Sequence, residues 1–331
     1  MKKLWPLPLA LLGLILSACT GSQEPPLPAL VAMGGEGEVR FFRARDLQGG
    51  TPNPVGTWNT PGLQDLAHSL GRLYLLFPDR LEAYSTQGFS EDTVPQPSPT
   101  QAAFPNDVDC TGGYLRLGQN RLLAHCPGAG RAFLWSLDAS GNLEEADLTG
   151  LPSGVRLALF SQGTLDLLAY MSPQALGYRP PQNPSGTPRL EKPLDPQASQ
   201  GPYDLQLDRL RERLLGLAAT ATEVRLYTLE GDSLTSQKVL GDFPQPSHLA
   251  LDPVGGMAVY GRGFQVLLPK ESSVQQEFRT YTAGLVSQDG YLYLVVQEQS
   301  LEVYDLVPSP AFLGRQALDF SPTSLAFIPV E

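Results

Sequence analysis

Residues that could carry out chemistry are scarce in this chain of 331 residues, and most of them recur at one type of position. Each directly precedes an apolar residue that could begin a β-strand, as in Pro202-Tyr-Asp-Leu205 and Pro246-Ser-His-Leu249. In chain order the residues at this position are Asp65, Asp107, Arg156, Asp204, His248, Gly284 and Ser324. If these strands surround one axis, their polar side chains would converge at one end of it, as in a binding site built on a rigid scaffold.

Five of these residues are the candidate ligand-binding residues: Asp65, Asp107, Arg156, Asp204 and His248. Three carboxylates near one axis would repel each other unless Arg156, His248 or a bound divalent cation balanced them. The alternative is that each aspartate hydrogen-bonds its own local backbone, as Asp commonly does at turns. No metal ligand set is assigned.

Recognised catalytic motifs are missing from the sequence: it has no nucleophile elbow, P-loop, dinucleotide fingerprint or HExxH. Gly34-Gly35-Glu36-Gly37 is not followed by a helical pattern, which indicates a hairpin turn rather than a phosphate loop. Asp138-Ala-Ser-Gly-Asn142 lacks the later acidic ligand of a calcium loop and indicates a turn between two outer strands. We therefore name no catalytic residue.

The cysteines are Cys19, Cys110 and Cys126. Cys110 and Cys126 are both eight residues from Gly118, in the predicted hairpin turn Leu117–Asn120. Residues equidistant from a turn face each other across an antiparallel pair, so we predict a disulfide between them. The alternatives are two unpaired buried thiols or a reactive thiol. His125 adjoins Cys126, but adjacent strand residues point to opposite faces, so the two do not form a metal site.

The elements that must position these residues follow a repeat. Val286–Leu306 contains two apolar strands around an Asp-Gly turn, a strong hairpin signal, and a third strand that closes on Tyr304. The third strand fits apolar-x-x-bulky in seven places: Val39–Phe42, Leu81–Tyr84, Ala132–Trp135, Ala175–Tyr178, Val224–Tyr227, Phe264–Leu267 and Leu301–Tyr304. The mean spacing of about 44 residues is typical of four-stranded units repeated around an axis.

The two ends of the repeat complement each other. The N-terminal copy has second and third strands, at 29–33 and 38–44, but no first strand, whereas Pro322–Val330 resembles a first strand with none after it. We predict that Ser324–Pro329 is the first strand of unit one and closes the ring, which removes exposed sheet edges. Leucines in Leu207–Val224 have helical spacing, but the repeat register predicts a strand pair there.

The units resemble soluble β-propellers of the NHL, YVTN and WD-repeat kind, through Pro-x-[Asp/His]-Leu and Asp289-Gly-Tyr-Leu-Tyr-Leu294 over roughly residues 29–331. No Trp-Asp dipeptide occurs, so no specific family is assigned. The resemblance implies an all-β fold: a seven-bladed β-propeller of four-stranded antiparallel blades, closed by the C-terminal strand joining blade one. It also implies that the first strand of each blade lines a central channel.

The N-terminus has the pattern of a targeting segment. Lys2 and Lys3 precede the apolar run Leu4–Leu16, which is too short for a membrane span. Leu16-Ser-Ala-Cys19 resembles the lipobox of bacterial lipoproteins, which implies cleavage before Cys19 and lipid attachment to it. We therefore expect a signal peptide at 1–18, lipidated Cys19 with a Pro-rich tether at 19–28, and a propeller domain at 29–331. The alternative is an ordinary secretory signal.

The charge excludes one class of partner. The chain carries a formal charge of −11, and removing residues 1–18 takes away two lysines, leaving 21 basic and 34 acidic side chains, or −13. No basic cluster interleaved with aromatic residues is present, so nucleic acid is not an expected partner. Anionic lipid would repel such a domain overall, which leaves the attached lipid as the membrane anchor.

From these observations we expect a lipid-anchored propeller of the cell envelope, on the outer membrane or another extracytoplasmic face, that acts as a protein- or ligand-binding scaffold. No cofactor is expected. The alternative is a propeller enzyme, a hydrolase or lyase with its site at the channel mouth, which would allow a divalent cation there. A metal-binding group of carboxylates would favour the enzyme, and an exposed apolar patch would favour a binding partner.

Overall fold

The computed structural model describes residues 28–49, 52–138, 142–162, 165–182, 189–239, 248–251, 257–267, 272–297, 299–306 and 310–330. The predicted signal peptide and Cys19 lie outside these residues. Within them the chain is almost entirely β-structure, and the described helix, α2 (Ala44–Leu47), is a single turn. None of the described helices is long and apolar enough to cross a bilayer.

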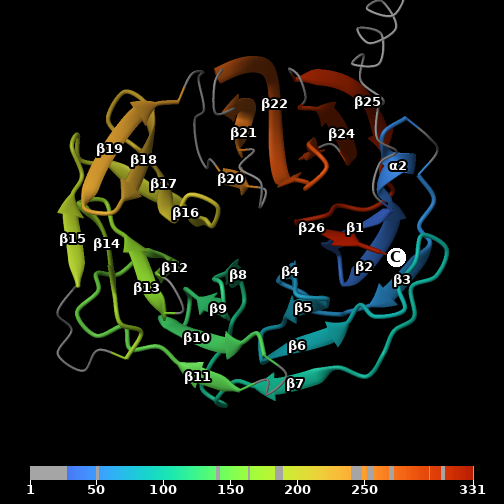
Figure 1. The fold of residues 1–331 in the computed structure, drawn as a ribbon, viewed down its shortest axis with the longest axis horizontal. Coiled ribbons are helices and arrows are strands. Elements are labelled where there is room, and N and C mark those ends of the chain that lie inside the picture. The colour runs from blue at the N-terminus through green and yellow to red at the C-terminus, as the bar shows by residue number, and fades with distance from the viewer. Residues whose placement is uncertain are drawn as a thin grey trace, which may run out of the picture.

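Six antiparallel sheets are arranged around a common axis (Figure 1). The first contains β26 (Ser324–Pro329), β1 (Ala29–Gly35), β2 (Glu38–Arg43) and β3 (Gly56–Asn59). The second contains β4 (Asp65–Ser69), β5 (Arg72–Leu76), β6 (Arg80–Ser85) and β7 (Thr100–Ala103). The third contains β8 (Tyr114–Leu117), β9 (Arg121–Cys126), β10 (Arg131–Ser136) and β11 (Leu143–Glu145).

The remaining sheets continue in chain order around the axis. The fourth contains β12 (Arg156–Gln162), β13 (Leu165–Met171), β14 (Ala175–Arg179) and β15 (Leu190–Pro193). The fifth contains β16 (Gln200–Asp208), β17 (Arg213–Ala219), β18 (Val224–Glu230) and β19 (Ser233–Lys238). The sixth has six strands: β20 (His248–Leu251), β21 (Met257–Leu267), β22 (Ser272–Val286), β23 (Tyr291–Val296), β24 (Ser300–Asp305) and β25 (Ala311–Ala317).

The third-strand pattern found strands, and in the five four-stranded sheets it found the third strand, but Phe264–Leu267 lies in β21, the second strand of the sixth sheet. Each of the seven apolar-x-x-bulky segments lies within a strand, for example Leu81–Tyr84 in β6 and Leu301–Tyr304 in β24. Leu207–Val224 enters the strand pair β16–β17 and the start of β18, so the repeat register outweighed the helical spacing of its leucines. The sixth sheet covers the last two expected units because β22 pairs with both β21 and β23. The count of seven units stays a prediction.

The first and last described strands belong to one sheet. β26 pairs antiparallel with β1, from Ala29 opposite Pro329 to Gly34 opposite Ser324. The bounds of β26 are those predicted for the closing strand. An apolar cluster that includes Val31, Phe42, Tyr293 and Val303 fills the space between this sheet and the end of the sixth. Similar clusters separate the other neighbouring sheets, so each sheet packs on the sheets beside it.

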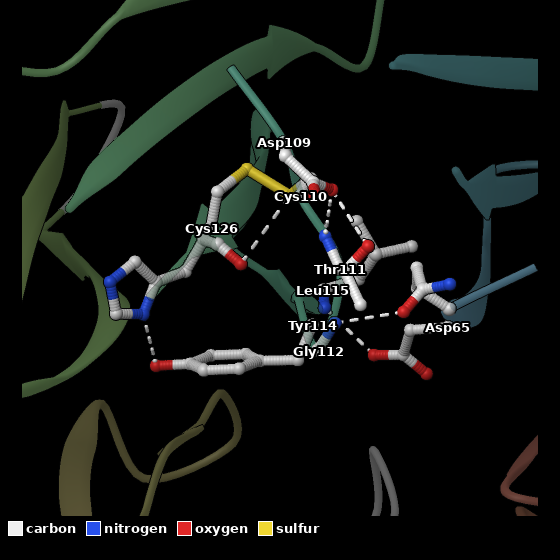
Figure 2. The surroundings of a disulfide bond; sticks show 10 residues. Asp65, Asp109, Cys110, Thr111, Gly112, Tyr114, Leu115 and Cys126 are labelled. Carbon is white, nitrogen blue, oxygen red and sulfur yellow. Dashed lines mark hydrogen bonds between the residues drawn. A yellow bond between two sulfur atoms is a disulfide. The ribbon is translucent and has the colours of Figure 1, made fainter. Parts of the chain in front are cut away.

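The disulfide between Cys110 and Cys126 is present (Figure 2), but the symmetry argument that predicted it had the wrong centre. Tyr114 pairs with His125 and Leu117 with Leu122, so the next residue opposite Cys126 is Gly113, not Cys110. A turn with a Gly113 N–H to Cys110 carbonyl bond of 2.9 Å carries Cys110 back beside that position. A Cβ on Gly113 would come within 2.6 Å of Cys110 Sγ, so glycine makes room for the bridge.

Candidate functional site

The inner strands of the ring begin at one face. The Asp65 carboxylate, at the start of β4, accepts a hydrogen bond of 2.7 Å from Leu115 N–H in β8. The Tyr114 hydroxyl accepts one of 2.9 Å from Leu157 N–H in β12. In the same way the Asp204 carboxylate accepts one of 2.8 Å from Leu249 N–H in β20.

These bonds join the start of β4 to β8, of β8 to β12 and of β16 to β20, and β12 packs beside β16. As the inner strands of one ring of sheets, the five strands begin at the same side. We call the side where they begin the leading face and the side where they end the trailing face. A further hydrogen bond joins Asp65 and Asp204 each to the N–H of its own next residue. For Asp65 and Asp204 the structure therefore bears out the local-backbone alternative, and it adds that each carboxylate also accepts a bond from a neighbouring sheet.

Side chains at these starts form one charged group, which we call the axial cluster. It consists of Asp65, Tyr114, Arg116, His125, Arg156, Asp204 and His248. Four of the five candidate residues belong to it: Asp65, Arg156, Asp204 and His248. Gly284 contributes no side chain, and the ring of Tyr260 fills the space where a Cβ would lie. Ser324 begins β26 and has a buried hydroxyl with no partner among the described residues.

Asp107 does not belong to the cluster, which corrects the sequence prediction. It lies in the loop between β7 and β8, where 73% of its side chain is exposed, and it pairs with Arg131 at 3.2 Å. The position equivalent to Asp65 in unit three is Tyr114, because Tyr114 makes the corresponding bond to the next sheet. The residues after Asp107 are turn formers, Asp109-Cys-Thr-Gly-Gly113, so the strand begins only at Tyr114.

Arg116 is the centre of the axial cluster. From β8 it passes the fourth sheet and reaches β16 of the fifth, where its Nη2 donates to Asp204 at 2.5 Å and its Nε to the Leu205 carbonyl at 3.1 Å. Its guanidinium carbon lies 4.5 Å from the centroid of the Tyr114 ring, within cation–π range. Arg116 thus connects the third and fifth sheets across the axis.

Two equivalent carboxylates have opposite pKa shifts. Burial raises the pKa of Asp65 to about 6, because two backbone N–H groups and the charge of Arg116 offset only part of its desolvation. Burial would also raise the pKa of Asp204, but Arg116, His248 and the Leu249 N–H outweigh it and lower the pKa below its ordinary value. The difference follows from Arg116, which donates directly to Asp204 and not to Asp65.

The histidines of the cluster are neutral at pH 7. Burial, together with the nearby charges of Arg156 and Arg116, lowers the pKa of His125 to about 4. The pKa of His248 is also lowered by burial and by the charges of Arg116 and Arg156, although the nearby Asp204 carboxylate opposes this shift. His125 Nδ1 lies 2.8 Å from the Tyr114 hydroxyl oxygen, and the planes of the two rings are at 90° to each other. Both imidazoles are therefore available as neutral hydrogen-bonding groups.

Arg156 differs from every other charged member of the cluster. Its guanidinium carbon lies 5.3 Å from the Tyr114 ring centroid, on a partly buried side chain. Among the described residues it has no hydrogen bond or ion pair to a carboxylate, while Arg116 is paired with Asp204. Its charge depresses the pKa values of His125 and His248. The cluster thus contains one cation that has no counter-ion among the residues that the structure describes.

Sequence reasoning missed Tyr114, Arg116 and His125. Tyr114 and Arg116 were missed because the first strand of unit three was expected to begin after Asp107, seven residues before its actual start at Tyr114. The signal that could have found them is Tyr114-Leu-Arg-Leu117, an alternating segment followed by a turn, as expected for a strand. No three His, Cys, Asp or Glu side chains in the described part of the chain lie close enough to hold a metal ion.

Comparisons with known proteins bear on the fold alone. No protein-family model matches this chain, and no curated protein matches it in sequence. A candidate 6-phosphogluconolactonase from Bacteroides uniformis has a TM-score of 0.62 and 12% identity, over 91% of this chain and 99% of that one. The apo form of AztD from Citrobacter koseri has a TM-score of 0.57 and 11% identity, over 91% and 97% of the two chains.

A second candidate 6-phosphogluconolactonase, from Bacteroides fragilis, has a TM-score of 0.60 at 13% identity, over 92% of this chain and all of its own. The fold is that of a β-propeller. At these identities the likeness reaches the arrangement of the sheets and not the residues of the axial cluster.

Proposed function

We propose that this protein is a lipid-anchored β-propeller of the cell envelope that binds a small anionic group, a carboxylate or a phosphate, at the leading face of its axial cluster. The observation that carries the proposal is Arg156, a partly buried cation with no counter-ion among the described residues. A carboxylate or phosphate bound there would accept a bidentate pair of hydrogen bonds from the planar guanidinium and balance its charge.

The surroundings of Arg156 favour an anion over a cation. Arg116 adds a second positive charge near the same tyrosine ring. Of the two carboxylates, Asp204 is engaged by Arg116 and two backbone N–H groups, and the pKa of Asp65 is raised to about 6. His125 and His248 are neutral and could donate or accept further hydrogen bonds. A divalent cation would meet two arginines here.

Thermal denaturation of the full mature chain with inorganic phosphate, sulfate and citrate tests the binding. A ligand at 100 times its dissociation constant stabilises a protein by about 2.7 kcal/mol, so the melting temperature should rise with anion concentration. Arg156→Gln should lose this rise. Arg121→Gln is the matched control, because Arg121 is a partly exposed arginine paired with Glu144, outside the cluster. An equal rise in all three proteins would contradict the proposal.

The anchor is tested separately, because Cys19 lies outside the described residues. Mass spectrometry of the native protein should find diacylglycerol on the sulfur of an N-terminal Cys19. Cys19→Ala should move the protein from the membrane fraction to the soluble fraction without changing its melting temperature. A mature N-terminus without lipid on the native protein would contradict the lipid anchor. It would not bear on the anion site, which the thermal denaturation experiment tests separately.

A further inference from the structure

Three leucines stand exposed at the trailing face. Leu70 follows β4, Leu165 begins β13 and Leu210 follows β16, with exposed fractions of 71%, 49% and 55%. Each lies at the turn between the first and second strands of its sheet. Single exposed leucines are ordinary, but three at equivalent turns of three sheets mark one surface.

Contacts between the turns confirm that they share this face. Asp166 in β13 accepts hydrogen bonds from the N–H groups of Gln119 and Asn120, in the turn between β8 and β9. Asp166 also attracts Arg209, in the turn after β16. On the other side of the ring, His68 near the end of β4 lies against the Phe327 carbonyl near the end of β26. The turns of successive sheets are therefore level with one another.

The N-terminal segment leaves from the same face. Pro28 precedes β1, and its carbonyl accepts a hydrogen bond of 3.0 Å from Val330 N–H, just past the end of β26. Since β26 ends at the trailing face, the chain before Pro28 departs there. Eight residues lie between Cys19 and Pro28, and a chain of nine residue steps reaches at most about 30 Å even when fully extended.

Arginines accompany the leucines. Arg72 is two residues from Leu70, and Arg209 adjoins Leu210. Arg72 is partly exposed and has no salt bridge within the part of the chain that the structure describes. Arg209 differs, because its Nη2 is buried and the side chain lies near Asp166. Arg121 and Arg213 lie at the same face but are paired with Glu144 and Asp208. Exposed apolar side chains beside an unpaired arginine, here Arg72, are typical of surfaces that contact lipid head groups.

We propose that the trailing face lies on the lipid surface, with Leu70, Leu165 and Leu210 among the head groups and Arg72 against their phosphates. This rests on the proposed anchor at Cys19, which would hold that face within reach of the bilayer. The opposite, leading face then points away from the membrane, so Arg156 is open to solutes or to partners in the surrounding compartment.

Tryptophan quenching by brominated phosphatidylcholine tests this orientation, because bromine quenches indole on contact. The mature chain, beginning at Cys19, is coupled through that residue to a maleimide lipid in vesicles with and without phosphatidylglycerol. This coupling makes the test independent of lipidation in the cell. Trp58 and Trp135 are buried and serve as an unquenched background. Leu70→Trp, Leu165→Trp and Leu210→Trp are each compared with Glu36→Trp.

Glu36 is a matched control for Leu70. Both lie at two-residue turns between neighbouring strands and have positive φ, 53° and 50°, but Glu36 follows β1 and lies at the leading face. We expect bromine to quench the three trailing-face tryptophans and not the tryptophan at 36. Equal, weak quenching at all four would mean that the tether holds the propeller off the lipid, and quenching at 36 alone would reverse the orientation.

A second copy of the chain on this face would also overturn the proposal. That occupant would give a concentration-dependent dimer in analytical ultracentrifugation without vesicles, abolished by Leu70→Ser with Leu210→Ser, and no bromine quenching. Failure of the anion test at Arg156 does not affect these readouts, and mass spectrometry of native Cys19 reports on the natural anchor separately.

Discussion

Units three and five begin with the same four-residue frame but use it differently. Pro202-Tyr-Asp204-Leu205 lies in β16, and Asp204 is 1% exposed with its carboxylate held by four donors. Pro105-Asn-Asp107-Val108 lies in a loop, and Asp107 makes a single exposed ion pair with Arg131. A motif that looks equivalent in the sequence thus gives a buried connection between sheets in one unit and a surface residue in the other.

The residues that follow the frame explain the difference. After Asp204 the sequence alternates, Leu205-Gln-Leu207, with leucines buried in the cluster shared by the fourth and fifth sheets. After Asp107 come turn formers, and the Asp109 carboxylate accepts a hydrogen bond from Thr111 N–H at 2.9 Å. Cys110 N–H donates to the Pro78 carbonyl, in the turn between β5 and β6, so this loop is hydrogen-bonded to the second sheet before β8 begins. A four-residue motif is too short to specify a strand without the alternation after it.

Asp204→Ala should have the largest effect. It removes a buried carboxylate and leaves Arg116 without its counter-ion, and breaking a buried pair in this way typically costs 3–5 kcal/mol, roughly, of unfolding free energy. Chemical denaturation of the variant and the parent measures the loss. Asp204→Asn keeps an acceptor oxygen and should lie between them. A loss below about 1 kcal/mol for Asp204→Ala would mean that the sheets do not depend on this connection.

Reduction of the disulfide should have the next largest effect. Cys110 and Cys126 are 16 residues apart, and chain-entropy arguments give roughly 3 kcal/mol for a loop of that length. The value is an upper bound here, because the Cys110 backbone is already bonded to Pro78. Reductant should therefore lower the melting temperature without preventing folding, and Cys110→Ala with Cys126→Ala should melt like the reduced parent. Titration of two free thiols in the native protein would contradict the pairing.

The sequence predicted the strands better than the site, for a physical reason. Third strands such as Leu81–Tyr84 are buried on both faces, so they need long apolar side chains and leave a clear pattern. Convergence of Asp65, Arg156, Asp204 and His248 could be predicted because each is fixed by strand position. Arg116 could not be assigned, because its partner Asp204 is 88 residues away and two sheets further on. Pairing across the axis leaves no local pattern in the sequence.

Asp65→Asn should change how stability depends on pH. The folded state holds the Asp65 proton up to a pKa of about 6, against an ordinary value of 3.8, so its contribution is present below pH 3.8 and is lost as pH rises toward 6. Two pKa units correspond to about 3 kcal/mol, and partial exposure reduces this to about 2 kcal/mol. The unfolding free energy of Asp65→Asn is subtracted from that of the parent at each pH between 4 and about 7. The difference isolates the contribution of Asp65, because the histidines are present in both proteins.

That difference curve should fall with rising pH and become flat above pH 7, roughly one unit past the raised pKa. Asp65→Asn retains an oxygen that can accept from Leu115 N–H, so the variant should fold. A difference curve that is flat throughout, or one that rises with pH, would mean that Asp65 is ionised in the fold as readily as Asp204.

Asp107→Ala should have the smallest effect, and its size decides whether the comparison between units three and five is sound. Exposed ion pairs contribute about 0–1 kcal/mol, and Arg131 keeps a second partner in Glu145. The variant should therefore unfold within about 0.5 kcal/mol of the parent, and a double-mutant cycle with Arg131→Ala should give a coupling energy of the same size. It should also leave any anion-dependent rise in melting temperature unchanged, because Asp107 is exposed and pairs with Arg131 rather than with the axial cluster. If Asp107→Ala instead matched Asp204→Ala in cost, the loop before β8 would carry a connection equivalent to that of β16, and the register that puts Tyr114 in the place of an aspartate would be wrong.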